Sequence, residues 1–129
     1  MLTVEKSTLF LDLGSTYTKC ALLRDGNVVR EKRLPSPDRK KGGYRWEVDG
    51  NQILAQCLEL ISELRDRDTS SLLISTQMHG CILTDGNGKP VSPYYSWQDR
   101  IGTVHLSEIQ DFLGKEATTP SGVPIINTS

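Results

Sequence analysis

The stretch from residue 9 to residue 34 reads LFLDLGSTYTKCALLRDGNVVREKRL, and it decides the fold. A short apolar run, Leu9–Leu13, ends at a Gly-Ser-Thr turn, and a second run, Tyr17–Leu23, follows it. The pair Asp25-Gly26 favours a tight hairpin turn before a third run, Asn27–Leu34, because glycine tolerates positive φ. Short apolar runs bounded by turn residues are typical of β-strands. The chain is therefore predicted to open with a three-stranded antiparallel meander.

The middle of the chain is predicted to form a helix and then another strand. Apolar residues recur at helical spacing over about residues 50–67, behind a capping-box pattern at Asp49 and Gln52. They are Ile53, Leu54, Cys57, Leu58, Ile61 and Leu64. The run Ser71–Ser75 favours a strand parallel to an earlier one, since it follows a helix. Open α/β sheets bind ligands where parallel strands end, so residues 77–80 form a candidate binding loop.

The remaining segments are less regular. Residues 35–45 read as a basic loop, and residues 81–84 and 91–95 resemble a second hairpin. Residues 99–113 are a predicted helix ended by Gly114, and residues 118–129 are a proline-containing tail without a terminating signal. The order of these elements predicts an α/β fold.

Composition excludes several classes of protein. The 129 residues carry 15 Lys and Arg against 16 Asp and Glu, a net charge of −1, which is typical of one globular domain and disfavours a nucleic-acid partner. No apolar run approaches the roughly 18 residues of a membrane helix, and the start lacks a signal peptide's basic region. The three widely spaced cysteines, Cys20, Cys57 and Cys81, are expected to be reduced core residues in a cytoplasmic protein.

The sharpest local feature is the segment DLGST at residues 12–16. Glycine lets backbone approach a ligand closely, and successive N–H groups in such a turn form a concavity that binds anions. The hydroxyls and a nearby lysine add donors, and the aspartate offers the oxygen that hydrated Mg²⁺ prefers. The predicted site for a nucleotide's phosphates and their metal consists of Asp12, Gly14, Ser15, Thr16 and Lys19, with Asp12 serving the metal. The alternative is an ordinary hairpin whose polar residues satisfy the turn.

This segment resembles the first phosphate motif of the actin/hexokinase/Hsp70-like superfamily, and two more segments narrow the resemblance. Residues 75–80, STQMHG, resemble the S-G-Q-M-H-G segment of FGGY carbohydrate kinases, typical of xylulokinase-like and sedoheptulokinase-like members. Residues 93–100, PYYSWQDR, are similar to that family's P-x-x-x-W-x-D-x-R, and Ser121-Gly122 resembles a following T-G motif. Thr76, Ile101 and Ser121 depart from the usual residues. The resemblance implies part of a ribonuclease H-like (actin-like ATPase) lobe, with a hairpin insertion and a further helix.

The resemblance also implies ATP-dependent phosphorylation of a sugar hydroxyl, with ATP and Mg²⁺ as cofactors and a ketose or polyol as the small-molecule partner. Xylulose is the first substrate to consider. The sugar-binding residues that it implies are Gln77, Met78, His79, Trp97 and Asp99. Four of them also have a plainer interpretation: His79 as a satisfied loop residue, Met78 as packing, Trp97 as core and Asp99 as the cap of the following helix. Tyr44 and Trp46 are interpreted as packing residues.

In this family the aspartate that accepts the hydroxyl proton lies beyond residue 129, and so do the second phosphate motif and the adenosine site. We therefore expect residues 1–129 to be an incomplete amino-terminal part of the first domain, with the second domain absent and no activity alone. The alternative is a non-catalytic phosphate-binding or assembly module. An incomplete sheet leaves unpaired edges, which predicts a homodimer or association through those edges. The Gly14 turn and the Met78–His79 loop are expected to face a common cleft.

Overall fold

The computed structural model describes residues 6–114, so the predicted tail and the Ser121-Gly122 motif lie outside the described residues. The chain divides into two compact units. The first takes its described residues from 6–37 and 51–77, and the second from 38–50 and 78–114. Each unit is described by itself.

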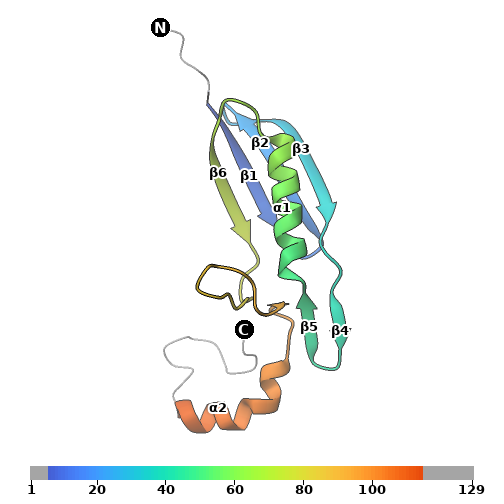
Figure 1. Ribbon diagram of the computed structural model, residues 1–129, viewed down its shortest axis with the longest axis vertical. Helices are drawn as coiled ribbons and strands as arrows, with labels where there is room; N and C mark the ends of the chain where they lie inside the picture. The colour runs from blue at the N-terminus through green and yellow to red at the C-terminus, as the bar shows by residue number, and fades with distance from the viewer. Residues whose placement is uncertain (1–5, 115–129) are drawn as a thin grey trace. The chain divides into compact units, whose positions relative to one another are not determined.

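The first unit is a four-stranded sheet with one helix on it (Figure 1). Its elements are β1 (Ser7–Leu13), β2 (Tyr17–Arg24), β3 (Asn27–Pro35), α1 (Gly50–Leu64) and β6 (Thr69–Thr76). The strand order is β3-β2-β1-β6; β1 pairs antiparallel with β2 and parallel with β6. The predicted meander, helix and parallel strand are thus confirmed. Asp25 and Gly26 both have positive φ, as the turn between β2 and β3 requires.

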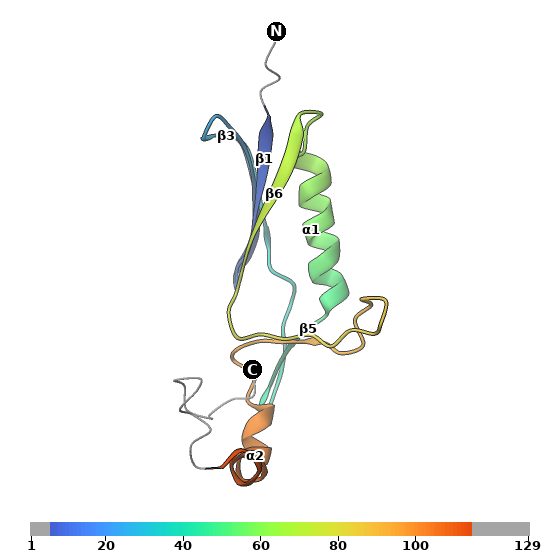
Figure 2. The same ribbon diagram turned by 90° about the vertical axis from the view of Figure 1, so that its left-hand side faces the viewer.

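The core of this unit lies between α1 and one face of the sheet, as the side view in Figure 2 makes plain. The buried sheet residues alternate along two strands, so all of them point toward the helix. They are Leu9 and Leu11 on β1 and Cys20 and Leu22 on β2, and they meet Cys57, Leu60 and Leu64 of α1. Burial raises the pKa of the Cys20 and Cys57 thiols, which keeps both protonated.

The prediction that all six apolar residues of the helix lie on one buried face is wrong for two of them. Leu54 and Leu58 are 52% and 56% exposed, whereas Leu60, which the pattern did not single out, is fully buried. The apolar arc of α1 is wider than the sector that meets the sheet. Leu54 and Leu58 lie on the part of that arc that no described residue covers.

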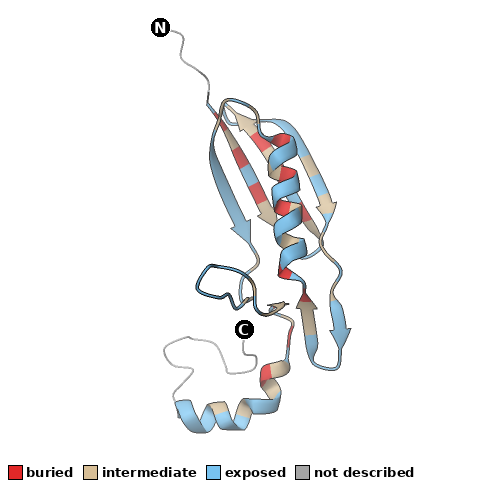
Figure 3. Ribbon diagram, viewed as in Figure 1, coloured by how far each residue is buried: buried red, intermediate tan, exposed pale blue. Residues whose placement is uncertain are grey.

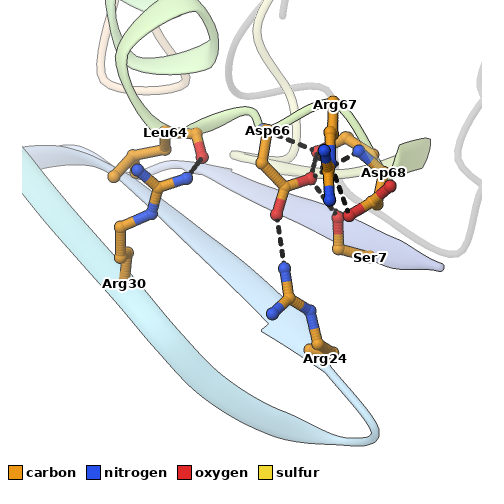
Figure 4. A network of polar contacts seen from close by, with 8 residues as sticks. Ser7, Arg24, Arg30, Leu64, Asp66, Arg67 and Asp68 are labelled. Atoms are coloured by element: carbon orange, nitrogen blue, oxygen red, sulfur yellow. Dashed lines mark hydrogen bonds and ion pairs between the residues drawn. The ribbon is translucent and has the colours of Figure 1, made fainter. Parts of the chain in front are cut away.

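A polar network closes the end of the sheet opposite the Gly14 turn (Figure 4). The Ser7 hydroxyl donates to Asp66 Oδ1 at 2.7 Å, and Arg24 Nη2 lies 2.7 Å from Asp66 Oδ2. The backbone N–H of Asp68 and the Thr69 hydroxyl also donate to Asp66 Oδ1. These hydrogen bonds, with that from Ser7 first, lower the pKa of Asp66 to about 2. The network therefore fixes the connection between α1 and β6.

The second unit contains a small three-stranded sheet and two helical segments. Its elements are β4 (Lys40–Gly42), β5 (Arg45–Val48), β7 (Tyr94–Tyr95), the 3₁₀ helix η1 (Ile101–His105) and α2 (Leu106–Leu113). The strand order is β4-β5-β7, and both pairings are antiparallel. The prediction of a loop over residues 35–45 is therefore wrong, because β4 and the start of β5 lie within it.

Two other predictions for this unit need correction. The expected second hairpin is reduced to single bridges, Cys81 to Tyr95 and Thr84 to Pro90, and Tyr95 also pairs with Glu47 of β5. The expected helix over residues 99–113 begins at Ile101 as a 3₁₀ turn and becomes α-helical only at Leu106. Cys81 is exposed, which contradicts its predicted place in a core. No helix among residues 6–114 is long and apolar enough to cross a membrane.

Candidate functional site

The turn between β1 and β2 is tight and braced from β3. The Gly14 N–H donates to the Tyr17 carbonyl at 3.0 Å. A Cβ at Gly14 would lie 2.8 Å from that carbonyl oxygen, so only glycine fits without a backbone shift. Ser36 holds the turn from the other side: its hydroxyl donates to the Gly14 carbonyl at 2.9 Å, and its N–H to the Thr16 carbonyl. Sequence reasoning missed Ser36, because only the pairing of β3 with β2 brings it to the turn.

Asp12 and Lys19 form an ion pair across the same hairpin. They are direct partners in the β1–β2 register, and Lys19 Nζ lies 3.0 Å from Asp12 Oδ2. Both side chains are partly exposed and line a hollow of about 640 Å³ together with Phe10 and Arg33. Ser15 and Thr16 are exposed at the tip of the turn. The structure thus brings all five predicted phosphate-binding residues onto one hairpin of the first unit.

The parallel pairing of β1 and β6 brings part of the second motif to the same edge of the sheet. Asp12 is the register partner of Ser75, and Leu13 that of Thr76. Gln77 follows directly, so it leaves the sheet where the Gly14 turn does. The Gln77 Oε1 atom is buried and accepts no hydrogen bond from the described residues. Buried acceptors are normally paired, so a buried oxygen without a donor among the described residues is unusual.

In the second unit, backbone bonds join the loop after Gln77 to the third motif. Cys81 and Tyr95 exchange N–H···O bonds of 3.1 and 2.8 Å. A Cβ at Gly80 would overlap the Tyr94 ring, so this glycine lets loop and strand pack together. His79 and Met78 are exposed, and His79 has φ 57°, which is uncommon for a residue with a side chain. The segment thus presents both side chains to solvent.

Trp97 lies on the wall of an open hollow and is not a core residue. It is 47% exposed, and the hollow of about 460 Å³ is also lined by Tyr44, Trp46, Gln98 and Arg100. The sequence predicted that Tyr44 and Trp46 are packing residues, but both line this hollow. A backbone hydrogen bond of 2.8 Å from the Arg100 N–H to the Tyr44 carbonyl ties the two sides of the wall together. Cations cover the Trp46 ring: Lys41 Nζ lies 4.5 Å from its centroid and the Arg39 guanidinium 5.7 Å.

Asp99 is buried, and its carboxylate holds backbone in place. Oδ2 accepts from the Trp46 N–H at 2.7 Å, and Oδ1 accepts from the Ile101 N–H at 2.9 Å. The bond to Ile101 lies at the start of η1, but the capping position of that helix is Arg100, so Asp99 is not its cap as the sequence alternative had it. The bond to Trp46 joins this segment to β5. That Asp99 contacts a sugar stays a prediction.

The number of acidic side chains that lie together limits the kind of metal site that the described residues can form. Among residues 6–114, no three His, Cys, Asp or Glu side chains are grouped so that they could hold a metal ion. Asp12 therefore offers one carboxylate. Mg²⁺ commonly binds proteins through one or two carboxylates, with waters and substrate phosphates completing its shell. The residues thus fit a metal that arrives with a nucleotide and do not fit a protein-built cage.

Comparison with known proteins finds carbohydrate kinases among the chain's relatives. The chain is 27% identical over 123 residues to a gluconokinase of Bacillus subtilis, covering 91% of this chain and 24% of the relative. It is 30% identical over 115 residues to a xylulose kinase of Lactococcus lactis, covering 83% and 23%. The crystal structure of a xylulose kinase from Rhodospirillum rubrum matches with a TM-score of 0.74 at 20% identity, covering 87% of this chain and 25% of that one.

These likenesses define both the fold and its extent. The fold is α/β, and its structural neighbours are sugar kinases with the actin-like ATPase fold. The chain spans about a quarter of the length of the relatives that it matches. Residues 7–126 match the model of the N-terminal domain of the FGGY family of carbohydrate kinases, and the chain therefore belongs to that family.

Proposed function

We propose that this chain supplies the phosphate-binding hairpin and part of the sugar-binding wall of an ATP-dependent carbohydrate kinase. The proposed acceptor is a hydroxyl of a ketose or polyol, with xylulose as the first substrate to test. The observation that carries the proposal is the parallel β1–β6 register, which sets Asp12 beside Ser75. Two motifs that begin 63 residues apart, at Asp12 and Ser75, therefore leave one sheet edge, where α/β sheets bind ligands.

The phosphate half rests on the hairpin. The turn around Gly14 is held by the Ser36 hydroxyl and carries no side chain at Gly14, so its backbone would be open to the approach of phosphate oxygens. Asp12 would provide a carboxylate ligand to an Mg²⁺ ion that binds together with the nucleotide. When bound, this ion neutralises phosphate charge. The Asp12–Lys19 pair would then open, so that Lys19 meets phosphate oxygens while Asp12 meets the metal.

The sugar half rests on exposed aromatic and polar groups. Trp97 and Tyr44 offer rings on which the apolar face of a sugar can stack, and the Trp97 indole is also a hydrogen-bond donor. Gln77 has a carbonyl oxygen without a donor, and a sugar hydroxyl is a suitable one. Met78 and His79 stand exposed for the same purpose. That these groups and the Gly14 turn face one cleft stays a prediction.

We further propose that residues 1–129 bind ligand without turning over ATP, as an incomplete first domain. Phosphoryl transfer needs a group that accepts the proton of the attacking hydroxyl, in line with the γ-phosphate. The family resemblance implies that this aspartate lies beyond residue 129. On that expectation, residues 1–129 alone are proposed to have no acceptor for the hydroxyl proton.

The test is ligand titration of the 129-residue chain, with ADP release measured in parallel. Tryptophan fluorescence should change saturably with xylulose, and His79→Ala should weaken that response at least tenfold. The matched control is His105→Ala, because His105 is an exposed helix residue outside the motifs. ADP release should stay at the background rate for every sugar tried. The proposal fails if no sugar or polyol perturbs the fluorescence, or if the two histidine variants respond alike.

The second candidate is an assembly module that keeps the hairpin without catalysis. The observation that favours it is β6, which pairs only with β1 among residues 6–114 and is almost entirely exposed. Nucleotide binding without any sugar response, together with self-association, would favour this module over the kinase.

A further inference from the structure

Ser36 lies between two prolines at the end of β3, in the sequence Pro35-Ser36-Pro37. A proline fixes its own φ, and it restricts the residue before it to extended backbone. Ser36 is therefore presented to its neighbours with little conformational freedom. Its hydroxyl donates to the Gly14 carbonyl at 2.9 Å, and its N–H donates to the Thr16 carbonyl at 2.9 Å. One residue thus binds two acceptors of the turn that carries the predicted phosphate site.

These two bonds determine which way the peptide N–H groups of the turn point. In a trans peptide the carbonyl and the N–H that follows it lie in one plane and point in opposite directions. The Gly14 carbonyl is directed at Ser36, so the N–H of Ser15 is directed away from Ser36. The Thr16 carbonyl is also directed at Ser36, so the Tyr17 N–H is directed away as well. Two N–H groups of the turn are therefore oriented away from Ser36.

The bond from the Ser36 hydroxyl also distinguishes this turn from an ordinary closed hairpin. A hydrogen-bonded pair of an antiparallel ladder exchanges two bonds, so in a closed hairpin Gly14 and Tyr17 would each donate to the other. Here the Gly14 N–H donates to the Tyr17 carbonyl at 3.0 Å. Within residues 6–114 the reciprocal bond is not formed, and the Gly14 carbonyl accepts the Ser36 hydroxyl instead. The brace thus takes the acceptor on which the Tyr17 N–H would close.

Gln56 of α1 fixes the segment that carries Ser36. Its Nε2 donates to the Pro35 carbonyl at 2.8 Å, and its Oε1 accepts from the hydroxyl of the buried Thr18 at 3.2 Å. These bonds lie in the first unit, where α1 meets the sheet and where buried residues gather in Figure 3. A line of hydrogen bonds therefore runs from the packed helix through residues 35 and 36 to the Gly14 turn.

We propose that Ser36 is a positioning residue for phosphate binding, which keeps the N–H groups of the turn directed at the phosphate oxygens, and that Gln56 acts through it. The inference rests on the proposed function, in which this hairpin binds the nucleotide's phosphates. Donors that are already oriented lose little conformational freedom when the anion binds, so the brace strengthens binding without touching the ligand. Ser36 donates both of its hydrogens into the turn, which is why its role is to orient the donors.

The test compares Ser36→Ala with Ser36→Thr in the 129-residue chain, because threonine keeps the hydroxyl and alanine removes it. Calorimetry measures Mg-ATP binding. Ser36→Ala should weaken it by about fivefold, the scale of one net hydrogen bond, and Ser36→Thr should stay within about twofold of wild type. The tryptophan response to xylulose should be the same in all three chains, whereas a general loss of structure would weaken both ligands. The matched control is Ser62→Ala, because Ser62 is exposed near the C-terminal end of α1.

Two further measurements examine the brace itself. Amide hydrogen exchange of the nucleotide-free chain, followed by NMR, should be slower at Tyr17 in Ser36→Ala than in wild type. The freed Gly14 carbonyl can then accept the Tyr17 N–H, which closes the hairpin. A double-mutant cycle tests Gln56: Gln56→Ala should weaken Mg-ATP binding in the wild-type background and have little further effect in Ser36→Ala, since it acts through Ser36.

Several results would overturn the proposal. Ser36→Ala could bind Mg-ATP as tightly as wild type, or leave exchange at Tyr17 unchanged. Ser36→Thr could lose as much affinity as Ser36→Ala, which would show that the hydroxyl is not the group that matters. Additive losses in the cycle would remove Gln56 from the relay. Failure of the proposed function is recognised separately, because the wild-type chain would then bind no Mg-ATP, and the role assigned to Ser36 would fall with it.

Discussion

The Asp99 carboxylate accepts a hydrogen bond of 2.7 Å from the backbone N–H of Trp46, 53 residues away in the sequence. Its other oxygen serves Ile101, and the Ser96 N–H donates to the Trp46 carbonyl. Asp99 thus fixes the loop that carries Trp97 against β5. Asp99 is the buried side chain that adds to these backbone bonds in holding the wall of the hollow, and its two oxygens serve two backbone donors.

Asp99→Ala should destabilise the chain by about 2–6 kcal/mol, since two partly buried N–H groups would lose their acceptor at about 1–3 kcal/mol each. Asp99→Asn should cost less, because its amide oxygen still satisfies one donor. Urea unfolding followed by tryptophan fluorescence measures both. Asp38→Ala is the control, since Asp38 is exposed. Equal stability of Asp99→Ala and the control would mean that the carboxylate does not hold the loop.

Gly14→Ala should displace the phosphate hairpin, because the added Cβ would meet the Tyr17 carbonyl oxygen at 2.8 Å. The contact is with backbone, so no side-chain movement relieves it. We expect a loss of about 1–3 kcal/mol in the free energy of unfolding and a loss of nucleotide binding in calorimetry. Gly42→Ala is the matched control, because a Cβ there meets nothing within 4 Å. Wild-type nucleotide affinity in Gly14→Ala would contradict the assignment of the hairpin.

Local signals account for what could be predicted of the fold. The meander was predictable because its strands alternate and Asp25-Gly26 needs no tertiary context to turn. The hairpin of β4 and β5 was not, because Lys40–Gly42 is polar and too short to alternate. Helical periodicity located the apolar arc of α1 but could not tell which sector of it meets the sheet, so Leu54 and Leu58 were misplaced.

Local sequence signals likewise predict one part of the candidate site and miss another. The residues predicted to bind phosphate all lie within residues 12–19, so a single local pattern selects them, and their role stays a prediction. The wall around Trp97 depends on contacts between residues about 50 positions apart, such as Arg100 with Tyr44, and no local pattern records such contacts. Ser36 was missed for that reason too. The resemblance to a family pointed to Trp97 as a site residue but did not identify the residues that line the hollow with it.

Stability should fall between about pH 4 and pH 2, and Asp66 should be one cause. Its pKa lies at about 2 in the folded chain, against 3.8 for the free side chain. A lowered folded pKa contributes stability that is fully present above the unfolded value and is lost as pH falls toward the folded value. Asp66→Asn should therefore be less stable at neutral pH and lose less stability across this window. Asp25→Asn serves as control, because Asp25 is exposed in a turn. An unchanged pH profile in Asp66→Asn would show that the network does not depend on this charge.

Gly80→Ala should disturb Tyr94, because the new Cβ would overlap the phenol ring. Burial raises the pKa of Tyr94, so displacement toward solvent should return that pKa toward its ordinary value. Spectrophotometric titration of the tyrosines measures this shift directly, and Gly86→Ala is the control, since a Cβ there meets nothing within 4 Å. A double-mutant cycle with Tyr94→Ala then isolates the contact: the cost of Gly80→Ala should largely vanish once the ring is gone. If the cost is the same with and without the ring, the loop that carries His79 is not held by this packing.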